Sequence, residues 1–328
     1  MPGRMECDKC GRDAAMHAAY SGQHLCEDHL VQSVESRVRN RVREDNLLPD
    51  DATPDDPETW VVGLSGGKDS VVLTTILQET FAQDPRVEVV ALSIHEGIEG
   101  YRDESLDAGR ALTDDLDVRH EVVTYEEEYD VRMDAVVEDD PLDMAACAYC
   151  GVFRRDALSR YAADLGADKL LTGHNLDDVA ETALMNLLEG DVAQVARNFD
   201  ASLGPFPGAD SERVREEGDD FVPRAKPLRD VPEKEVALYA HFRDLPAHVT
   251  ECPHAEEAYR GEIKELLLGL EENHPGTRHS IVAGYEELAG LAASEYRRET
   301  AGDLGECDEC GAATARDVCR TCSLREAL

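Results

Sequence analysis

The sequence predicts an α/β protein with a parallel sheet and a small cysteine-rich module near each end of the chain. From Trp60 onward, short apolar runs alternate with longer amphipathic stretches, which is the pattern of parallel strands joined by helices. Eight of the ten cysteines fall in four C-x-x-C pairs, and Cys26 and His29 add a C-x-x-H pair. In an intracellular protein this spacing favours bound metal over disulfides.

The segments follow one another in a clear order. We expect a zinc finger over residues 1–30, a helix with a linker over 31–57, and an α/β domain over 58–200. Residues 201–300 hold a loop insertion and a more helical part with Cys252, and 301–328 form a zinc ribbon. In the second segment, helical spacing predicts an apolar stripe of Val31, Val34, Val38 and Val42.

Within the α/β domain, four apolar runs are expected strands and four amphipathic stretches are expected helices. The strands are Trp60–Leu64, Val87–Ile94, Val118–Thr124 and Lys169–Thr172. The helices are Ser70–Gln83, Arg102–Asp115, Val152–Leu165 and Leu176–Glu189. Leu203–Asp220 lacks periodicity and predicts a surface loop, and further helices are expected over Val231–Phe242, Ala255–Leu270 and Thr277–Tyr296.

The charge balance indicates adaptation to salt. The 328 residues include 71 acidic and 33 basic side chains, for a net charge of −38 spread along the chain. At low salt this charge would oppose compaction, whereas near 1 M salt the Debye length falls to about 3 Å. We therefore expect a halophilic protein, as in haloarchaea. The acidic balance argues only weakly against nucleic-acid binding, because molar salt removes most of the counterion-release term for any protein.

The sequence lacks the marks of a membrane protein. It has no run of eighteen apolar residues, and Met1 to Cys10 lacks the apolar stretch of a signal peptide. We expect a cytoplasmic protein without membrane contact.

A glycine-rich segment connects the first expected strand to an apolar helix. Glycines let the backbone turn tightly and point successive N–H groups at an anion, and the helix N-terminus adds a favourable field. The segment predicts a phosphate site, but its spacing is not that of a Walker-type NTPase. The acidic residue at its fifth position, Asp69, also has an ordinary explanation, because acidic residues are favoured in the first turn of a helix. The residues are Ser65, Gly66, Gly67, Lys68, Asp69 and Ser70.

Three cysteines lie outside the terminal modules. Cys147 and Cys150, in the sequence C-A-Y-C-G, precede an expected helix that carries Arg154, and Cys252 follows much later. Three thiolates can hold an iron–sulfur cluster and leave one iron open, because a cubane cluster takes four ligands. Two of them could instead act as persulfide carrier and resolving thiol. A zinc site completed by His254 is the third alternative.

The segment T-G-H-N-L-D-D follows the last expected strand. Gly173 and His174 lie at the strand end, and Asp177 and Asp178 lie in the first turn of the next helix. Open α/β sheets place their chemistry at the carboxyl ends of strands. Acidic residues also cap helices, so this segment alone leaves a structural role open.

Together these motifs resemble those of a known family. S-G-G-K-D-S is similar to the PP-loop of the ATP pyrophosphatase superfamily, which has an adenine nucleotide alpha hydrolase-like fold. With C-A-Y-C-G, T-G-H-N-L-D-D, R-A-K-P-L and E-C-P, the chain resembles the tRNA 2-thiolation enzymes of archaea and the eukaryotic cytosol. The resemblance covers nearly the whole chain, and the terminal zinc modules distinguish this group from its relatives.

The resemblance implies a role for each motif. Members cleave ATP to AMP and pyrophosphate, so residues 65–70 would surround the pyrophosphate, with Lys68 offsetting charge and Asp69 helping to place Mg²⁺. The end of the second strand, at His95, would contact adenine, and Gly173 and His174 would complete the nucleotide site. Catalytic roles fall on Asp69, Asp177, Asp178, Cys147, Cys150 and Cys252.

The resemblance also implies the metal ligands. Cys147, Cys150 and Cys252 would bind a [4Fe–4S] cluster. One zinc ion would lie on Cys7, Cys10, Cys26 and His29, with His17 and His24 as spare candidates. The second would lie on Cys307, Cys310, Cys319 and Cys322.

The implied reaction is the adenylation of a uridine C2 carbonyl in tRNA, with wobble U34 preferred, followed by replacement of the oxygen by sulfur. Sulfur would come from a ubiquitin-like carrier protein or from sulfide, and relatives suggest a homodimer. Relatives carry a basic residue where Arg154 stands, and an arginine cannot replace a lysine that transfers a proton. Arg224, Lys226 and Arg229 form a local basic patch suited to tRNA phosphate, although a solvated loop explains Arg229 equally well.

Rival interpretations remain open at this point. A 2-thiocytidine synthase or a U54 thiolase would share the phosphate loop and the core cysteines. An amide-forming PP-loop ligase would need no cluster. A non-catalytic zinc-ribbon RNA-binding protein could use ATP only to regulate affinity.

Overall fold

The computed structural model describes residues 5–192, 194–195, 222–250, 252–254, 259–300, 305–314 and 316–328. The loop expected over Leu203–Asp220 lies outside the described residues. The apolar runs form a five-stranded sheet in the order β5-β4-β3-β6-β7, in which every pairing is parallel. The predicted α/β class is therefore confirmed. The strands are β3 (Glu58–Gly63), β4 (Val87–His95), β5 (Arg119–Thr124), β6 (Lys169–Thr172) and β7 (Arg224–Ala225).

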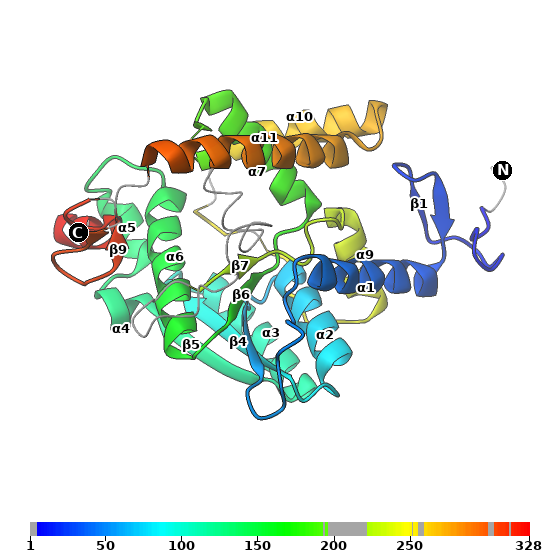
Figure 1. The fold of residues 1–328 in the computed structure, drawn as a ribbon, viewed down its shortest axis with the longest axis horizontal. Coiled ribbons are helices and arrows are strands. Elements are labelled where there is room, and N and C mark those ends of the chain that lie inside the picture. Colours follow the sequence, from blue (N-terminus) through cyan, green and yellow to red (C-terminus); the bar gives the residue numbers. More distant parts are fainter. Residues whose placement is uncertain are drawn as a thin grey trace.

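Helices cover both faces of the sheet (Figure 1). One apolar cluster joins the sheet to α1, α2 and α9, and a second joins its other face to the α4–α6 segment and α12. Central strand residues such as Val61 and Val62 are fully buried between them. The helices are α2 (Lys68–Phe81), α3 (Tyr101–Leu116), α4 (Tyr125–Tyr129), α5 (Met133–Asp139), α6 (Ala146–Asp164), α7 (Leu176–Glu189) and α9 (Glu233–Phe242).

The N-terminal module is a hairpin of β1 (Met16–Ala18) and β2 (Gln23–Leu25) that leads into α1 (Glu27–Glu44). The buried stripe of α1 starts at Leu30 and continues through Val34, Val38 and Val42. The predicted stripe is confirmed, since Val31 also packs against this core, and Leu30 is an additional member. Val31 is only partly buried, because the helix turns it to the margin of the contact with the core.

A buried polar contact ties the N-terminal module to the sheet domain. The carboxylate of Glu235, which has no exposed surface, forms an ion pair with Arg37 of α1. It also accepts a 2.7 Å hydrogen bond from the hydroxyl of Tyr20 in the hairpin. Arg37 further donates to the carbonyl of Asp230 at 3.1 Å. Hairpin, α1 and α9 are thus held together.

The C-terminal module consists of β8 (Gly305–Glu306), β9 (Ala313–Thr314) and α12 (Arg320–Ala327). Its helix packs on α6, with Leu324 fully buried in the cluster on that face. Figure 1 shows the two cysteine-rich modules at opposite ends of the molecule. The core site described below therefore lies between two separate small domains.

The helices α10 (Tyr259–Asn273) and α11 (Thr277–Thr300) run side by side and pack on α7. Ion pairs reinforce this packing on the side near the sheet. Arg278 contacts Asp177 at 3.0 Å, Arg260 contacts Glu181 at 3.1 Å, and Lys264 contacts Glu233 at 3.2 Å. The pair of helices α10 and α11 is therefore anchored to the N-terminal turns of α7 and α9.

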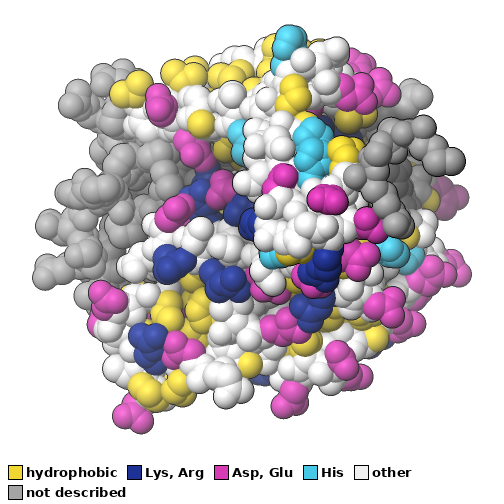
Figure 2. Space-filling model, turned by 90° about the vertical axis from the view of Figure 1, so that its right-hand side faces the viewer, with side chains coloured by type: hydrophobic (Ala, Val, Ile, Leu, Met, Phe, Trp, Pro, Cys, Tyr) yellow, Lys and Arg dark blue, Asp and Glu magenta, His cyan; other side chains and the backbone are white. Residues whose placement is uncertain are grey.

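Carboxylates are scattered over the whole face seen in Figure 2, with arginine and lysine side chains among them. This agrees with a charge spread along the chain. In the described part of the chain, no helix is long and apolar enough to cross a membrane.

Candidate active site

The glycine-rich segment forms a tight loop between β3 and α2. Gly66 has φ of +80°, and a Cβ there would lie 1.8 Å from the carbonyl oxygen of Ser105 in α3. Any larger residue would therefore clash. The hydroxyls of Ser65 and Ser70 lie 3.0 Å apart across the loop, and α2 starts directly after Gly67. The geometry presents backbone N–H groups and a helix N-terminus at one point, as a phosphate site requires.

Lys68 and Asp69 stand at the mouth of this loop. The Lys68 ammonium lies 2.9 Å from the Asp69 carboxylate and 3.0 Å from that of Glu233. Asn175 donates a 3.0 Å hydrogen bond to the other oxygen of Asp69. Burial raises the pKa of Asp69, although Lys68 and Asn175 act in the opposite direction. The loop thus has one cation and one carboxylate fixed by residues of α7 and α9.

The start of α7 brings a second carboxylate to the loop. Asn175 and Asp178 form a reciprocal capping box, so the helix-cap role of this segment is real. Asp178 also lies close enough to Asp69 to raise its pKa. Asp177 points elsewhere, because it accepts from the backbone N–H of Glu233 at 2.8 Å and pairs with Arg278. The structure therefore distinguishes the two residues: Asp177 is held by Glu233 and Arg278, whereas Asp178 caps α7 and acts electrostatically on Asp69.

His174 lies at the end of β6, where its Nδ1 is 2.8 Å from the Thr172 hydroxyl. Its side chain is exposed, with the cationic side chains of Lys226 and Arg260 nearby. Desolvation, assisted by Lys226 and Arg260, lowers its pKa to about 4. His174 is therefore neutral at pH 7. Gly173 packs against the start of α2, since a Cβ there would lie 2.8 Å from the backbone nitrogen of Ser70.

The end of β4 carries His95. Its Nδ1 accepts from the backbone N–H of Gly97 at 3.0 Å, so its Nε2 carries the proton and faces Asp103 at 3.3 Å. The loops after β3, β4 and β6 all open at the same edge of the sheet, because these strands are parallel neighbours.

The three core cysteines lie beside this edge. Cys147 is exposed, Cys150 is buried and Cys252 is intermediate. They influence one another, since the charge of Cys147 raises the pKa of both other thiols, in addition to the larger effect of burial. The prediction that Cys147 and Cys150 precede the helix is wrong. Both lie in the first turns of α6, which begins at Ala146.

The segment that carries Cys252 is attached to the phosphate loop. The backbone N–H of His248 donates to the carbonyl of Gly66 at 2.9 Å, and residues 67 and 248 form a parallel β-bridge. Only three residues separate His248 from Cys252. The segment that leads to Cys252 is therefore tied to the phosphate loop through its backbone.

The terminal cysteine sets have a different geometry. In each set the four ligand atoms lie within 4.8 Å of one another. The Sγ atoms of Cys10 and Cys26 are 3.7 Å apart, as are those of Cys310 and Cys319. A tetrahedral zinc ion with Zn–S bonds of about 2.3 Å requires sulfurs about 3.8 Å apart. Both sets therefore fit zinc, with Nδ1 of His29 as the fourth ligand at the N-terminal site.

Local hydrogen bonds lower the pKa of one thiol in each terminal set. The backbone N–H of Cys319 donates to the sulfur of Cys307 at 3.2 Å and, with other backbone groups, lowers the pKa of Cys307 to about 6. Burial raises the pKa of Cys7, but backbone groups outweigh it and lower the value to about 6. His17 and His24 stack on each other with centroids 4.4 Å apart and belong to neither set.

The core thiols do not form such a set with any described residue. His254, the proposed fourth ligand of a third zinc site, is hydrogen-bonded to Asp134 at 2.6 Å. The geometry therefore disfavours a third tetrahedral zinc site among the described residues.

The predicted basic patch is largely occupied by internal contacts. Arg229 is buried and pairs with Glu286 of α11, so both its assignment to tRNA contact and the solvated-loop interpretation are wrong. Arg224 donates to the carbonyl of Arg155 at 3.0 Å. Lys226 follows β7 and lies near His174 and Asp178, so it faces the site rather than open surface.

Sequence reasoning missed three charged residues of the site: Glu96, Arg102 and Glu233. Glu96 follows β4 directly, and its position after a strand is the one signal that could have found it. Arg102 and Glu233 sit in the first turns of helices, where charged residues are common, and the sequence does not distinguish them.

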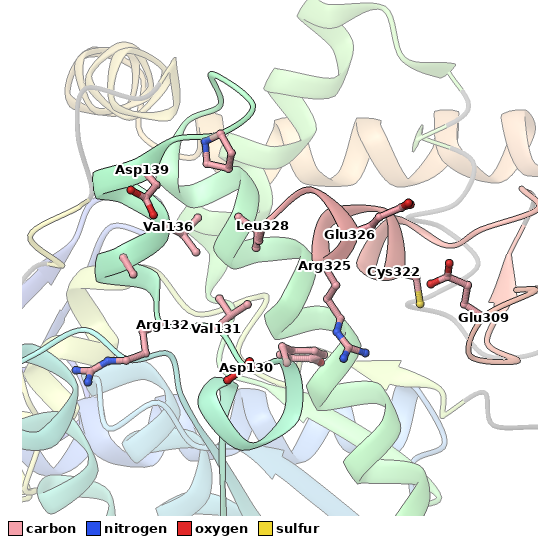
Figure 3. A pocket seen from close by; sticks show the side chains of 13 residues that line it. Asp130, Val131, Arg132, Val136, Asp139, Glu309, Cys322, Arg325, Glu326 and Leu328 are labelled. Atoms are coloured by element: carbon pink, nitrogen blue, oxygen red, sulfur yellow. The ribbon is translucent and has the colours of Figure 1, made fainter.

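A cavity of about 720 Å³ lies away from this site, between the α4–α5 segment and the C-terminal module (Figure 3). Its lining includes Asp130, Asp139, Glu309 and Glu326, against the guanidinium groups of Arg132 and Arg325. This excess of carboxylates is unsuited to a nucleotide phosphate, and neither the loop nor the core cysteines reach it.

Fold and site together define a class of protein. It is an α/β nucleotide-binding protein that has a phosphate-binding loop, three core cysteines and two terminal cysteine-rich modules. Comparisons with known proteins place the chain within this class. A family model described as "PP-loop domain" matches residues 32–249, and one described as "2-thiouridine synthetase TtuA, N-terminal LIM domain" matches residues 6–31.

Full-length relatives narrow the assignment. The chain is 70% identical over 324 residues to "tRNA 2-thiolation protein NcsA" of Haloferax volcanii, covering 99% of each chain. It is 36% identical over 321 residues to "Cytoplasmic tRNA 2-thiolation protein 1" of Drosophila melanogaster, covering 98% of this chain and 87% of that protein. The solved "U34-tRNA thiolase NcsA from Methanococcus maripaludis with its [4Fe-4S] cluster" matches with a TM-score of 0.80 at 33% identity, over 100% and 97% of the two chains. The chain therefore belongs to the PP-loop family of tRNA 2-thiolation proteins.

Proposed function

We propose that this protein converts the wobble uridine U34 of tRNA to 2-thiouridine, using ATP and a sulfur donor. The observation that carries the proposal is the attachment of the Cys252 segment to the phosphate loop through the hydrogen bond from His248 to Gly66. Activation of the carbonyl and delivery of sulfur must occur at one C2 atom. A site that joins a phosphate loop to three thiols meets this requirement.

The phosphate loop serves the first half of the reaction. The C2 oxygen of uridine attacks the α-phosphorus of ATP, and pyrophosphate leaves. The backbone N–H groups of residues 65–70 bind the pyrophosphate, and Lys68 at the mouth of the loop offsets its charge. Asp69 and Asp178 form the carboxylate pair suited to a hydrated Mg²⁺ ion, which prefers one or two carboxylates plus substrate oxygens. His95, Gly173 and His174 border the nucleotide.

The core thiols serve the second half. Sulfur attacks C2, and the original oxygen leaves with AMP. Cys150 and Cys252 lie in one apolar cluster, and the exposed Cys147 lies one turn before Cys150 in α6. These three thiols, which do not form a compact set of the zinc type, suit a [4Fe–4S] cluster held by three cysteines. Such a cluster supplies an iron with an open position that can bind sulfide. Cys147, Cys150 and Cys252 would hold it, and the burial of Cys150 excludes water from that side.

Partners follow from the same reaction. tRNA is the substrate, and sulfide or the thiocarboxylate of a ubiquitin-like carrier is the sulfur donor. We further propose two structural zinc ions in the terminal modules, a homodimeric assembly, and a place of action in the cytoplasm, as the name of the Drosophila relative states for that protein.

The test is thiolation by the anaerobically purified protein with ATP, Mg²⁺, sulfide and a tRNA transcript that carries U34. Mass spectrometry of the nucleosides should reveal 2-thiouridine, and digestion should map it to position 34. A transcript with C34 is the matched control and should stay unmodified. Thiolation at U54 or at a cytidine, or ATP binding without any thiolation, would overturn the proposal.

A further inference from the structure

A buried glutamate lies between the phosphate loop and the core thiols. We propose that Glu96 is a positioning residue, which holds the Arg154 guanidinium against the Cys150 sulfur and links this contact to the phosphate loop through Arg102. The inference rests on the proposed thiolation reaction and assigns a residue that acts between its two halves.

Glu96 contacts an arginine with each of its carboxylate oxygens. It is 1% exposed and follows the last residue of β4. Its Oε1 accepts from Nε of Arg154 at 3.0 Å and lies 2.8 Å from Nη2 of the same side chain. Its Oε2 lies 2.6 Å from Nε of Arg102. One carboxylate thus joins two guanidinium groups from α3 and α6.

Arg102 fixes this carboxylate relative to the phosphate loop. It is buried, and its guanidinium donates to the carbonyl of Ile94 at 2.6 Å and to that of Ser65 at 2.9 Å. Ser65 is the first residue of the loop. A shift of the loop on nucleotide binding therefore reaches Glu96 through a single buried side chain.

Arg154 has fewer restraints. Half of its side chain is exposed, and Nη2 donates to the sulfur of Cys150 at 3.2 Å. Among the described residues, the Arg154 guanidinium forms hydrogen bonds and ion pairs with Glu96 and Cys150. Without Glu96, a long and half-exposed side chain would have only a weak sulfur acceptor to hold it in place.

The chemistry requires this restraint. Arginine stays protonated, so Arg154 contributes a fixed positive charge and an N–H donor to sulfur and does not transfer a proton. A donor of this kind acts only when its orientation is fixed, and residues that fix ligands from behind commonly change activity by about 10–100-fold when altered.

The experiment compares Glu96→Asp, Glu96→Gln, Arg154→Gln and the double variant Glu96→Asp/Arg154→Gln. The shorter Asp keeps the charge beside Arg102 but cannot reach both arginines. We expect each single variant to lower the kcat of thiolation about 10–100-fold with KM for ATP unchanged. The double variant should be no slower than Arg154→Gln, because Glu96 acts through Arg154.

The matched control is Glu128→Gln. Glu128 of α4 forms an ion pair at 2.9 Å with Arg160, which lies in α6 as Arg154 does. This variant therefore removes a comparable ion pair between α6 and a neighbouring element. It should keep nearly full activity. A second readout uses the cluster-free protein: the Arg154 Nε–H signal in nitrogen-15 NMR, assigned by its loss in Arg154→Gln, should persist in the wild type and in Glu128→Gln and vanish in both Glu96 variants.

Three results would overturn the proposal. The first is a double variant whose loss of kcat is the product of the two single losses. The others are a loss of kcat in Glu128→Gln equal to that in the Glu96 variants, and an unchanged Arg154 Nε–H signal in the Glu96 variants. If both Glu96 variants fail to fold while Arg154→Gln folds, Glu96 serves only to neutralise Arg102. A wild type without thiolation overturns the proposed function instead, and the NMR comparison still decides the role of Glu96.

Discussion

The terminal cysteines and the core cysteines share the C-x-x-C spacing, but their surroundings differ. At both ends, the second ligand pair opens a helix and the first lies in a turn that closes at a glycine with positive φ, Gly11 or Gly311. All four ligands come from one short stretch and lie within 4.8 Å of one another. The core set takes Cys252 from a distant segment, and its three thiols do not lie within such a compact set.

This difference separates two uses of cysteine. We propose that each terminal set binds an ion that stabilises a small module, because each module is too small for an apolar core of its own. The core set is assembled by the fold of the whole domain, beside the phosphate loop. Changes at the ends should therefore affect stability, and changes at the centre should affect chemistry.

The largest expected effect is the loss of thiolation in a phosphate-loop variant that keeps both terminal modules intact. Asp69→Ala should lower thiolation by at least about 100-fold, because it removes a carboxylate that holds Lys68 and faces Asp178. Zinc content and thermal unfolding should match the wild type, since Asp69 lies outside both terminal sets. If Asp69→Ala thiolated tRNA at the wild-type rate, the proposed role of the phosphate loop in the reaction would be wrong.

The next effect tests the terminal side. Cys319→Ala removes one of four ligands at the C-terminal set and the sulfur that accepts from the backbone of Cys322. We expect the loss of one zinc ion per chain and protease sensitivity confined to residues 305–328. Iron content should stay unchanged. A variant that loses iron as well would show that the two kinds of site are not independent.

A smaller effect compares how the modules are attached. The C-terminal helix packs by the apolar Leu324, whereas the N-terminal module adds contacts with the buried Glu235 carboxylate to its apolar packing. Arg37→Ala leaves that charge without its cation and should reduce the free energy of unfolding by about 3–5 kcal/mol in denaturant titration. The neighbouring Arg39→Ala breaks only a more exposed pair with Glu35 at 3.4 Å and should cost less than about 1 kcal/mol. Equal losses of unfolding free energy in the two variants would contradict a stabilising role for the buried Arg37–Glu235 ion pair.

Local patterns predicted much of this structure from the sequence. β6 and α7 begin and end at the expected residues, because a short apolar run and a strong capping box mark them. β7 was missed, since a strand of two residues has no periodicity. The start of α6 was placed too late, because C-x-x-C is typical of loops although the segment is rich in the helix former alanine.

The candidate site divides in the same way. The phosphate loop has a local signature, so its residues could be named from the sequence. The contacts of Arg229 with Glu286 and of Glu96 with Arg102 and Arg154 depend on tertiary neighbours. No local pattern reports which charged side chains a fold will bury together, and the choice between Asp177 and Asp178 required the structure for the same reason.

The most direct test is metal analysis of four anaerobically purified proteins: the wild type, Cys147→Ala, Cys150→Ala and Cys252→Ala. We predict about four iron and about two zinc per chain in the wild type, because a cubane cluster and two tetrahedral sites account for all ten cysteines. Each variant should lose its iron and its thiolation while it keeps about two zinc. A wild type without iron, or with a third zinc ion in its place, would contradict the division between terminal and core cysteines.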